Sequence, residues 1–245
     1  METALSEARA NPYKVEFRTH IELALALAEI YLEGDDIEAA RAVLEERAAF
    51  AEKIFQIMQA TGTTEQKREA AGGRIQIRDR FRQVSLLNRE APEISVKEWI
   101  RGEPATLRSL RGSVVLLEFW ATWCKPCQEM FPKLTELHEE YCERGLEVIA
   151  LTRHYFAYRG TADSIGEELE LMRKVVREHE LDFRVGVSET EQTQELYGAT
   201  GMPMLCLIDR EGMVRYAHFG GGEDPKFKEI LRQCLDGDLT AAGPV

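Results

Sequence analysis

The sequence has little positive charge and no long apolar run. Its 245 residues carry 31 Lys and Arg against 43 Asp and Glu, which gives a formal net charge of -12 at pH 7. An acidic chain of this kind is a poor match for a polyanionic partner such as nucleic acid or an anionic membrane surface. Because no stretch of about 18 consecutive apolar residues is present, we expect no membrane-spanning helix. Hydrophobic residues still make up 44% of the chain, which is enough for a substantial core.

The start of the chain lacks the marks of an export signal. Residues 1–10 are polar and acidic, whereas a signal peptide begins with a basic segment followed by an apolar run. We therefore expect a cytoplasmic location, or an extracytoplasmic one (periplasmic or exported) if a signal was trimmed.

Cysteines are few and mostly far apart. Only Cys124 and Cys127 are close in the sequence, while Cys142, Cys206 and Cys234 are isolated. The dense and even set of cysteines that staples small secreted domains is therefore absent. A structural zinc ion needs about four Cys or His ligands, usually as two pairs, and the sequence has no second pair.

The first third of the chain is expected to be helical. Apolar residues recur at helical spacing over 15–32 and again over 37–58, which predicts two helices. Gly34 breaks the first pattern. Asp35 and Glu38 have the spacing of a capping box, which would begin the second helix.

The rest of residues 1–90 adds a further helix and a partial repeat. That helix follows Thr63, and Gly72 and Gly73 are expected to interrupt it or end it early. The stretch 27–40 resembles one tetratricopeptide unit, a helical hairpin that can recruit partners. A single unit is too short for a solenoid, because each repeat needs neighbours to bury its face. The alternatives are a partner-binding hairpin, a homodimer contact through these helices, or a plain hairpin that covers the second domain.

The spacing of apolar residues changes at Ala91 and Pro92, and residues 91–245 are predicted to form one α/β domain. Short β-rich runs alternate with helical stretches and end in a hairpin and a helix. The run 113–120 is almost continuously apolar, as in a strand that is covered on both faces. Strands are expected at 94–100, 113–120, 146–152, 183–187, 204–208 and 214–219, and helices at 126–144, 165–179, 191–197 and 225–235.

The close cysteine pair lies where a buried strand gives way to a helix. A helix N-terminus offers unpaired N–H groups and the positive end of the helix dipole, and both stabilise the thiolate of Cys124 or Cys127. Lys125 adds a positive charge, and Pro126 is tolerated in the first helical turn. With two residues between them, the sulfurs are within disulfide reach. The alternatives are half of a zinc site and an inert buried pair.

Two motifs carry a family resemblance. The segment 119–127, FWATWCKPC, resembles the thioredoxin superfamily and, within it, the TlpA/ResA-like branch. A second signature follows in the expected order, with Gly-Met-Pro at 201–203 and Leu-Ile-Asp at 207–209. The resemblance covers about residues 92–235. It implies a thioredoxin fold, a central mixed sheet flanked by helices, preceded here by an all-helical N-terminal region.

The resemblance also implies a role for Glu118, a charged residue in an apolar strand. A buried, unpaired carboxylate is costly, so burial raises its pKa and suits it to accept a proton near neutral pH. The family carries a buried acid at this position, which implies that Glu118 deprotonates Cys127, through water. The alternative is a glutamate on an edge strand that points at solvent.

The substrate-binding residues are also implied by the resemblance. Pro203 resembles the family's cis-proline, which would face the cysteine pair and present the Met202 backbone to an extended substrate strand. Trp123 abuts the nucleophile and would flank the substrate groove, with Lys125 and Pro126 beside it. The long segment 152–180 contains His154, Tyr155, Phe156 and Tyr158, which either line a partner-binding edge or belong to an ordinary covering helix and its loop.

The function implied is thiol–disulfide exchange. Cys124 would attack a disulfide of a substrate protein, Cys127 would resolve the mixed disulfide, and an upstream thiol donor would restore the pair, with no cofactor. The resemblance favours a reductant, for cytochrome c maturation or other exported cysteine pairs. One alternative is a thiol peroxidase with antioxidant activity, although Ala121 stands where peroxiredoxins carry Thr or Ser. The other is a redox-switched interaction module that uses the N-terminal helices.

Overall fold

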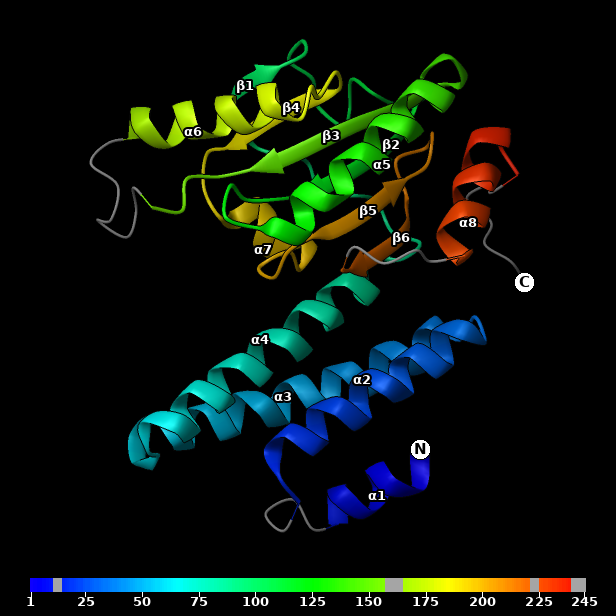
Figure 1. Ribbon diagram of the computed structural model, residues 1–245. Coiled ribbons are helices and arrows are strands. Elements are labelled where there is room, and N and C mark those ends of the chain that lie inside the picture. The colour runs from blue at the N-terminus through cyan, green and yellow to red at the C-terminus, as the bar shows by residue number, and fades with distance from the viewer. Residues whose placement is uncertain (11–14, 157–164, 221–224, 239–245) are drawn as a thin grey trace. The chain divides into compact units, whose positions relative to one another are not determined.

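The protein consists of two compact units. The computed structural model describes residues 1–10, 15–156, 165–220 and 225–238, and Figure 1 shows their helices and strands. The first unit is Met1–Ser85 and the second is Leu86–Val245. The boundary expected from the sequence, after residue 90, lies a few residues later than this division.

Every element that the structure describes in the first unit is a helix. Helices α2 (Phe17–Glu33) and α3 (Ile37–Thr61) form a hairpin, and α4 (Thr64–Leu86) follows after a short turn. The polar and acidic start of the chain forms α1 (Glu2–Ala10). Small and branched apolar residues fill the hairpin core: Ile21, Ala24, Leu27, Ala28, Ala40, Val43, Leu44 and Ala51.

The cap of α3 differs from the predicted one. The side chain of Asp36, not that of Asp35, accepts the backbone N–H of Ala39 at 3.0 Å. Asp35 instead occupies the left-handed region, with φ at 59°. Aspartate tolerates this conformation because its short side chain can form local hydrogen bonds. The turn therefore contains one residue more than the capping-box spacing implied.

The prediction that Gly72 and Gly73 break the third long helix is wrong, because α4 runs through both. Its first turn is closed by the capping pair Thr63 and Gln66, whose side chains each accept the other's backbone N–H. A β-carbon at position 73 would lie 2.5 Å from the ring of Phe17, so glycine lets α2 approach α4. This contact offsets the helix propensity of about 1 kcal/mol that Gly73 loses relative to alanine, whereas Gly72 has no such contact.

The second unit is built on a six-stranded mixed sheet, which confirms the predicted architecture. The strand order is β1-β4-β3-β2-β5-β6, in which β2, β3 and β4 are parallel and the other strands are antiparallel to their neighbours. Every residue of the central strand β2 is buried, as its continuous apolar run predicts. The strands are β1 (Val96–Arg101), β2 (Val114–Phe119), β3 (Leu146–Thr152), β4 (Arg184–Ser188), β5 (Met204–Ile208) and β6 (Val214–Phe219).

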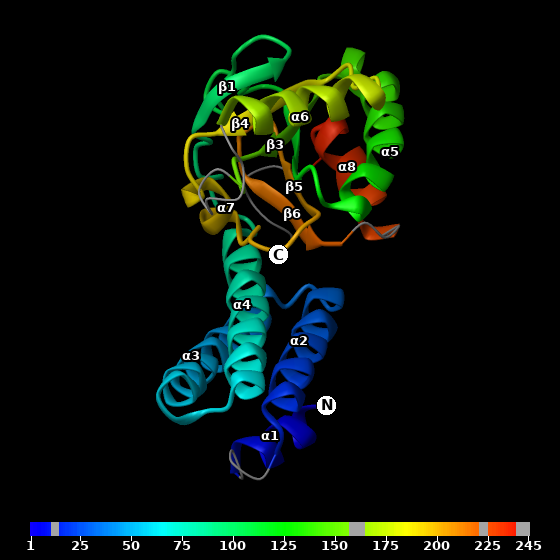
Figure 2. The ribbon, with the colours of Figure 1, turned by 60° about the vertical axis from the view of Figure 1, so that its left-hand side comes forward.

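Helices cover both faces of the sheet. Figure 2 shows α5 (Lys125–Tyr141), α6 (Ile165–Glu178) and α8 (Pro225–Asp236) on one side and α7 (Gln192–Tyr197) on the other. The first three helices share one hydrophobic cluster with the sheet, whereas Tyr197 of α7 belongs to the second cluster. A 3-10 turn, Cys142–Arg144, continues α5 toward β3. Among the described residues, no helix is long and apolar enough to cross a membrane.

Candidate active site

The predicted cysteine pair forms a disulfide at the junction of β2 and α5. The Cα atoms of Cys124 and Cys127 are 5.3 Å apart. Cys124 is the N-cap residue of α5, and its Sγ accepts the backbone N–H of Cys127 at 3.3 Å. Cys124 is 4% exposed and Cys127 is fully buried, so Cys124 is the more accessible residue of the pair. This asymmetry matches the predicted roles of attacking and resolving cysteine.

The start of α5 is arranged to stabilise negative charge on Cys124. Unpaired N–H groups and the positive end of the helix dipole face the N-cap position. Pro126 lies in the first turn, where its missing N–H has no helical partner to lose. The Lys125 side chain is 86% exposed, and its Nζ lies 3.7 Å from the Glu129 carboxylate, so Lys125 lies on the surface beside the pair.

Glu118 lies on the central strand and is fully buried. Its register partners, Ala150 on β3 and Leu205 on β5, belong to the cluster on the face that α5 covers. Both carboxylate oxygens are buried, with no hydrogen-bond partner in the described part of the chain. Burial therefore raises the pKa of Glu118 well above its ordinary value. The alternative of a solvent-facing glutamate on an edge strand is wrong.

The loop before β5 reaches the same end of the sheet as the disulfide. The Met202–Pro203 peptide bond is cis, as the family resemblance implies. Because β5 is antiparallel to β2, its first residue, Met204, pairs with the last residue of β2, Phe119. The chain continues from Phe119 directly toward Cys124. The antiparallel register thus brings Pro203 and the cysteine pair to one edge.

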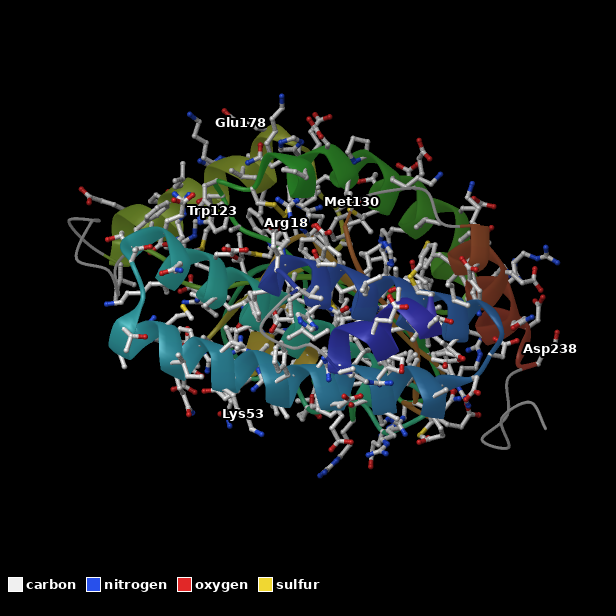
Figure 3. The ribbon with its side chains drawn as sticks, turned by 90° about the horizontal axis from the view of Figure 1, so that it is seen from below. Arg18, Lys53, Trp123, Met130, Glu178 and Asp238 are labelled. Atoms are coloured by element: carbon white, nitrogen blue, oxygen red, sulfur yellow. A yellow bond between two sulfur atoms is a disulfide. The ribbon has the colours of Figure 1, made fainter. Side chains whose placement is uncertain are left out.

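Trp123 and Met202 are linked by Tyr155, for which no specific role was predicted. The exposed Trp123 ring, at 54% exposure, meets the ring of Tyr155 edge-on, with centroids 5.6 Å apart. The Tyr155 hydroxyl donates to the Sδ atom of Met202 at 3.2 Å. Figure 3 shows Trp123 beside the start of α5, with Met130 further along that helix. The only sequence signal for Tyr155 was the aromatic group 154–158, and Tyr158 lies outside the described residues.

The other cysteines do not contribute to this site. Cys206 is buried on β5, and its burial raises the pKa of its thiol. Cys234 is also buried: α8 packs this side chain into the core, and burial raises the pKa of its thiol to about 12. Cys142 is exposed. Within the described ranges, no three His, Cys, Asp or Glu side chains are grouped so that they could hold a metal ion.

Comparisons with known proteins agree on the second unit. A family model described as the AhpC/TSA family matches residues 87–217. The thiol-disulfide oxidoreductase ResA of Bacillus thuringiensis subsp. konkukian is 29% identical over 148 residues, which are 60% of this chain and 78% of the relative. ResA of Halalkalibacterium halodurans is 31% identical over 136 residues, 56% of this chain and 70% of the relative.

A solved structure supports the same assignment. A thiol-disulfide isomerase from Corynebacterium glutamicum superposes with a TM-score of 0.51 at 26% identity, covering 59% of this chain and 96% of that protein. The family model and the ResA relatives match a unit whose disulfide, cis-proline loop and mixed sheet have the geometry described above. The chain therefore belongs to the AhpC/TSA family and, within the thioredoxin superfamily, to the ResA-like thiol-disulfide oxidoreductases.

Proposed function

We propose that this oxidoreductase reduces disulfides in substrate proteins through the Cys124–Cys127 pair. The observation that carries the proposal is the disulfide at the start of α5, with the more accessible cysteine of the pair at the N-cap position. The reduced form of this pair stores two electrons, which is what one protein disulfide requires. An upstream thiol donor returns the pair to the reduced state, and no further cofactor is needed.

The first step forms a mixed disulfide. The Cys124 thiolate attacks one sulfur of the substrate disulfide, the substrate S–S bond breaks, and the other substrate sulfur leaves as a thiolate that takes up a proton. The N–H groups at the start of α5 stabilise the attacking thiolate. The rate depends on the thiolate fraction and on the nucleophilicity that remains, so the best thiol has a pKa near the working pH.

The second step releases the substrate. The Cys127 thiol gives its proton to the Glu118 carboxylate, through water, and the resulting thiolate attacks the Cys124 sulfur. The mixed disulfide breaks, the reduced substrate departs as a dithiol, and the Cys124–Cys127 disulfide forms. Glu118 suits this role because burial raises its pKa well above the ordinary value, and a carboxylate with a higher pKa is a stronger base.

Residues around the disulfide form the substrate site of this proposal. Trp123 supplies an exposed ring next to the nucleophile, and the backbone at Met202, before the cis bond to Pro203, offers hydrogen bonds to an extended segment. Lys125 and Pro126 complete the surface between the two cysteines. The substrates would be proteins with a disulfide accessible in an extended segment, including exported cysteine pairs such as those of apocytochromes c.

The reduction potential of the Cys124–Cys127 pair tests the direction of electron flow. The pair is equilibrated with glutathione or dithiothreitol, and free thiols are trapped and counted. A potential near that of thioredoxin, about -270 mV, would support a reductant. A potential near about -120 mV, together with oxidation of reduced ribonuclease A, would show an oxidant and overturn the proposal. Insulin reduction by the full chain, driven by dithiothreitol, is the matching activity assay.

A further inference from the structure

Tyr155 contacts both sides of the proposed substrate site. Its ring meets Trp123, which precedes the nucleophile, and its hydroxyl meets Met202, which precedes the cis-proline. These two partners come from separate loops, one following β2 and the other preceding β5. Tyr155 itself is only 6% exposed, so it lies behind the surface and supports it from within. Burial raises the pKa of Tyr155 to about 12, so its hydroxyl keeps the proton that it donates to Met202.

A buried carboxylate fixes the backbone at Tyr155. The Oε1 atom of Glu168, on α6, accepts the N–H of Tyr155 at 2.6 Å and the N–H of Phe156 at 3.1 Å. Glu168 is 3% exposed, so both hydrogen bonds are shielded from water. The two bonds therefore pin the chain where it leaves β3.

A cation holds the ring of Tyr155 from another direction. The Arg153 guanidinium lies 4.2 Å from the centroid of this ring. The same guanidinium is 3.2 Å from the carboxylate of Glu191, before α7, which anchors it. Such a cation–π contact is stronger when it is partly desolvated. Backbone and ring are thus both restrained, by Glu168 and by Arg153.

We infer that Tyr155 is a positioning residue for this oxidoreductase: held by Glu168, it sets the relative placement of Trp123 and Met202 and so preorganises the binding of protein substrates. The inference rests on the proposed substrate site. Without the Tyr155 ring, Trp123 and Met202 can adopt further rotamers, and binding a substrate must order them again. Each side chain that must be ordered weakens binding by roughly two- to tenfold. A small-molecule disulfide contacts too little of the surface to depend on both Trp123 and Met202. Loss of the Tyr155 ring should therefore change its KM much less.

The test compares kinetic constants of full-length variants on two disulfides. Tyr155→Ala is expected to raise the KM for insulin by about tenfold, with a much smaller change in kcat, in the KM for bis(2-hydroxyethyl) disulfide and in the reduction potential. Tyr155→Phe keeps the ring and loses only the bond to Met202, so its KM should rise about twofold. The matched control is Tyr141→Ala, which also removes a ring under an arginine, Arg144, but at the far end of α5.

A second pair of variants separates positioning from folding. Glu168→Gln keeps an oxygen that can accept both N–H groups and should leave the KM for insulin within about twofold, whereas Glu168→Ala should raise it as Tyr155→Ala does. The inference is overturned if both disulfides lose rate by the same factor, or if Tyr155→Ala behaves as Tyr141→Ala. If the wild-type protein oxidises reduced ribonuclease A and does not reduce insulin, the reductant proposal fails. The same KM comparison with reduced ribonuclease A then still decides the role of Tyr155.

Discussion

The backbone N–H of Cys127 donates to the Sγ atom of Cys124, so Cys127 contacts the sulfur of the proposed nucleophile through its main chain as well as through the disulfide. This hydrogen bond does not depend on the Cys127 side chain. It remains available when the disulfide opens and Cys124 becomes a thiolate. The support for the first step of exchange is therefore separable, by mutation, from the resolving thiol.

Cys127→Ser should trap the reaction halfway. The variant keeps the N–H that supports Cys124, so attack on a substrate disulfide continues, but no thiol resolves the product. We expect a mixed disulfide between Cys124 and the substrate, seen by mass spectrometry or on a non-reducing gel. Cys124→Ser is the control and should form no such species. Equal amounts of mixed disulfide in both variants would contradict the assignment of the attacking cysteine.

Glu118→Gln should slow resolution rather than attack. Glutamine is nearly isosteric but cannot accept the Cys127 proton, so the mixed disulfide should persist longer than in the wild-type protein. General-base catalysis typically contributes about 10²–10⁴-fold, and we expect a loss in that range near neutral pH. Rapid-quench measurement of the mixed disulfide checks this. The loss should shrink as the pH rises, because hydroxide then deprotonates Cys127; a pH-independent loss would argue against a base.

The contribution of Glu118 to the stability of the protein should fall as the pH rises above the ordinary pKa of a glutamate. The pKa of Glu118 is raised from 4.5 by burial, so above pH 4.5 the unfolded chain releases this proton while the folded chain retains it. A raised folded-state pKa favours folding below the unfolded value and loses that contribution as the pH rises toward the folded value. Urea unfolding of wild type and Glu118→Gln from pH 4 to pH 8 measures the difference. Glu118→Gln should gain relative stability across this range; parallel curves would contradict the prediction.

Gly72 and Gly73 should respond to alanine in opposite ways. A β-carbon at position 73 meets the Phe17 ring at 2.5 Å, whereas one at position 72 meets nothing within 4 Å. Gly73→Ala should destabilise the helical unit by about 1–3 kcal/mol through overpacking. Gly72→Ala should stabilise it by about 1 kcal/mol through helix propensity. Urea unfolding followed by circular dichroism checks both, and the same sign for the two variants would contradict the packing of α2 against α4.

Removal of the helical unit should leave disulfide reduction intact. The deletion must end at residue 85, because Leu86 and Leu87 pack into the second unit and the Asn88 side chain accepts from Arg215 at 2.9 Å. We expect the truncated chain to reduce insulin at a rate within about threefold of wild type, since no residue of the proposed cycle lies before β2. If the helices join two copies, light scattering should show the truncated chain as a monomer. Loss of reductase activity in a folded truncation would tie the helices to the active site.

Local signals in the sequence predicted most of the second unit. The strand expected at 146–152 is Leu146–Thr152, and the continuous apolar run at 113–120 contains the buried strand β2. Both follow from burial on two faces, which leaves little room for polar residues. The C-x-x-C pair at a strand–helix boundary predicted the disulfide for the same local reason. Glu118 was recognisable as a candidate functional residue because an unpaired charge is costly to bury in an apolar strand.

Contacts between distant residues were not predictable. Gly72 and Gly73 were expected to interrupt or end a helix. The contact that favours glycine at position 73 comes from the Phe17 ring, more than fifty residues earlier in the chain, and no local pattern reveals it. Cys234 is buried because α8 packs it into the core. The helical spacing of apolar residues alone does not predict this orientation of α8. Tyr155 is the clearest case: its partners Trp123 and Met202 lie in two other loops, and only the fold brings the three together.

Because the three free cysteines differ in exposure, thiol labelling can report the redox state of the Cys124–Cys127 pair. Cys142 is exposed, whereas Cys206 and Cys234 are buried and their thiols have raised pKa values. A thiol-specific label applied to the folded, oxidised protein should therefore attach once, at Cys142. Any additional label on the folded protein reports an opened Cys124–Cys127 bridge, so Cys142 provides a built-in internal standard for each measurement.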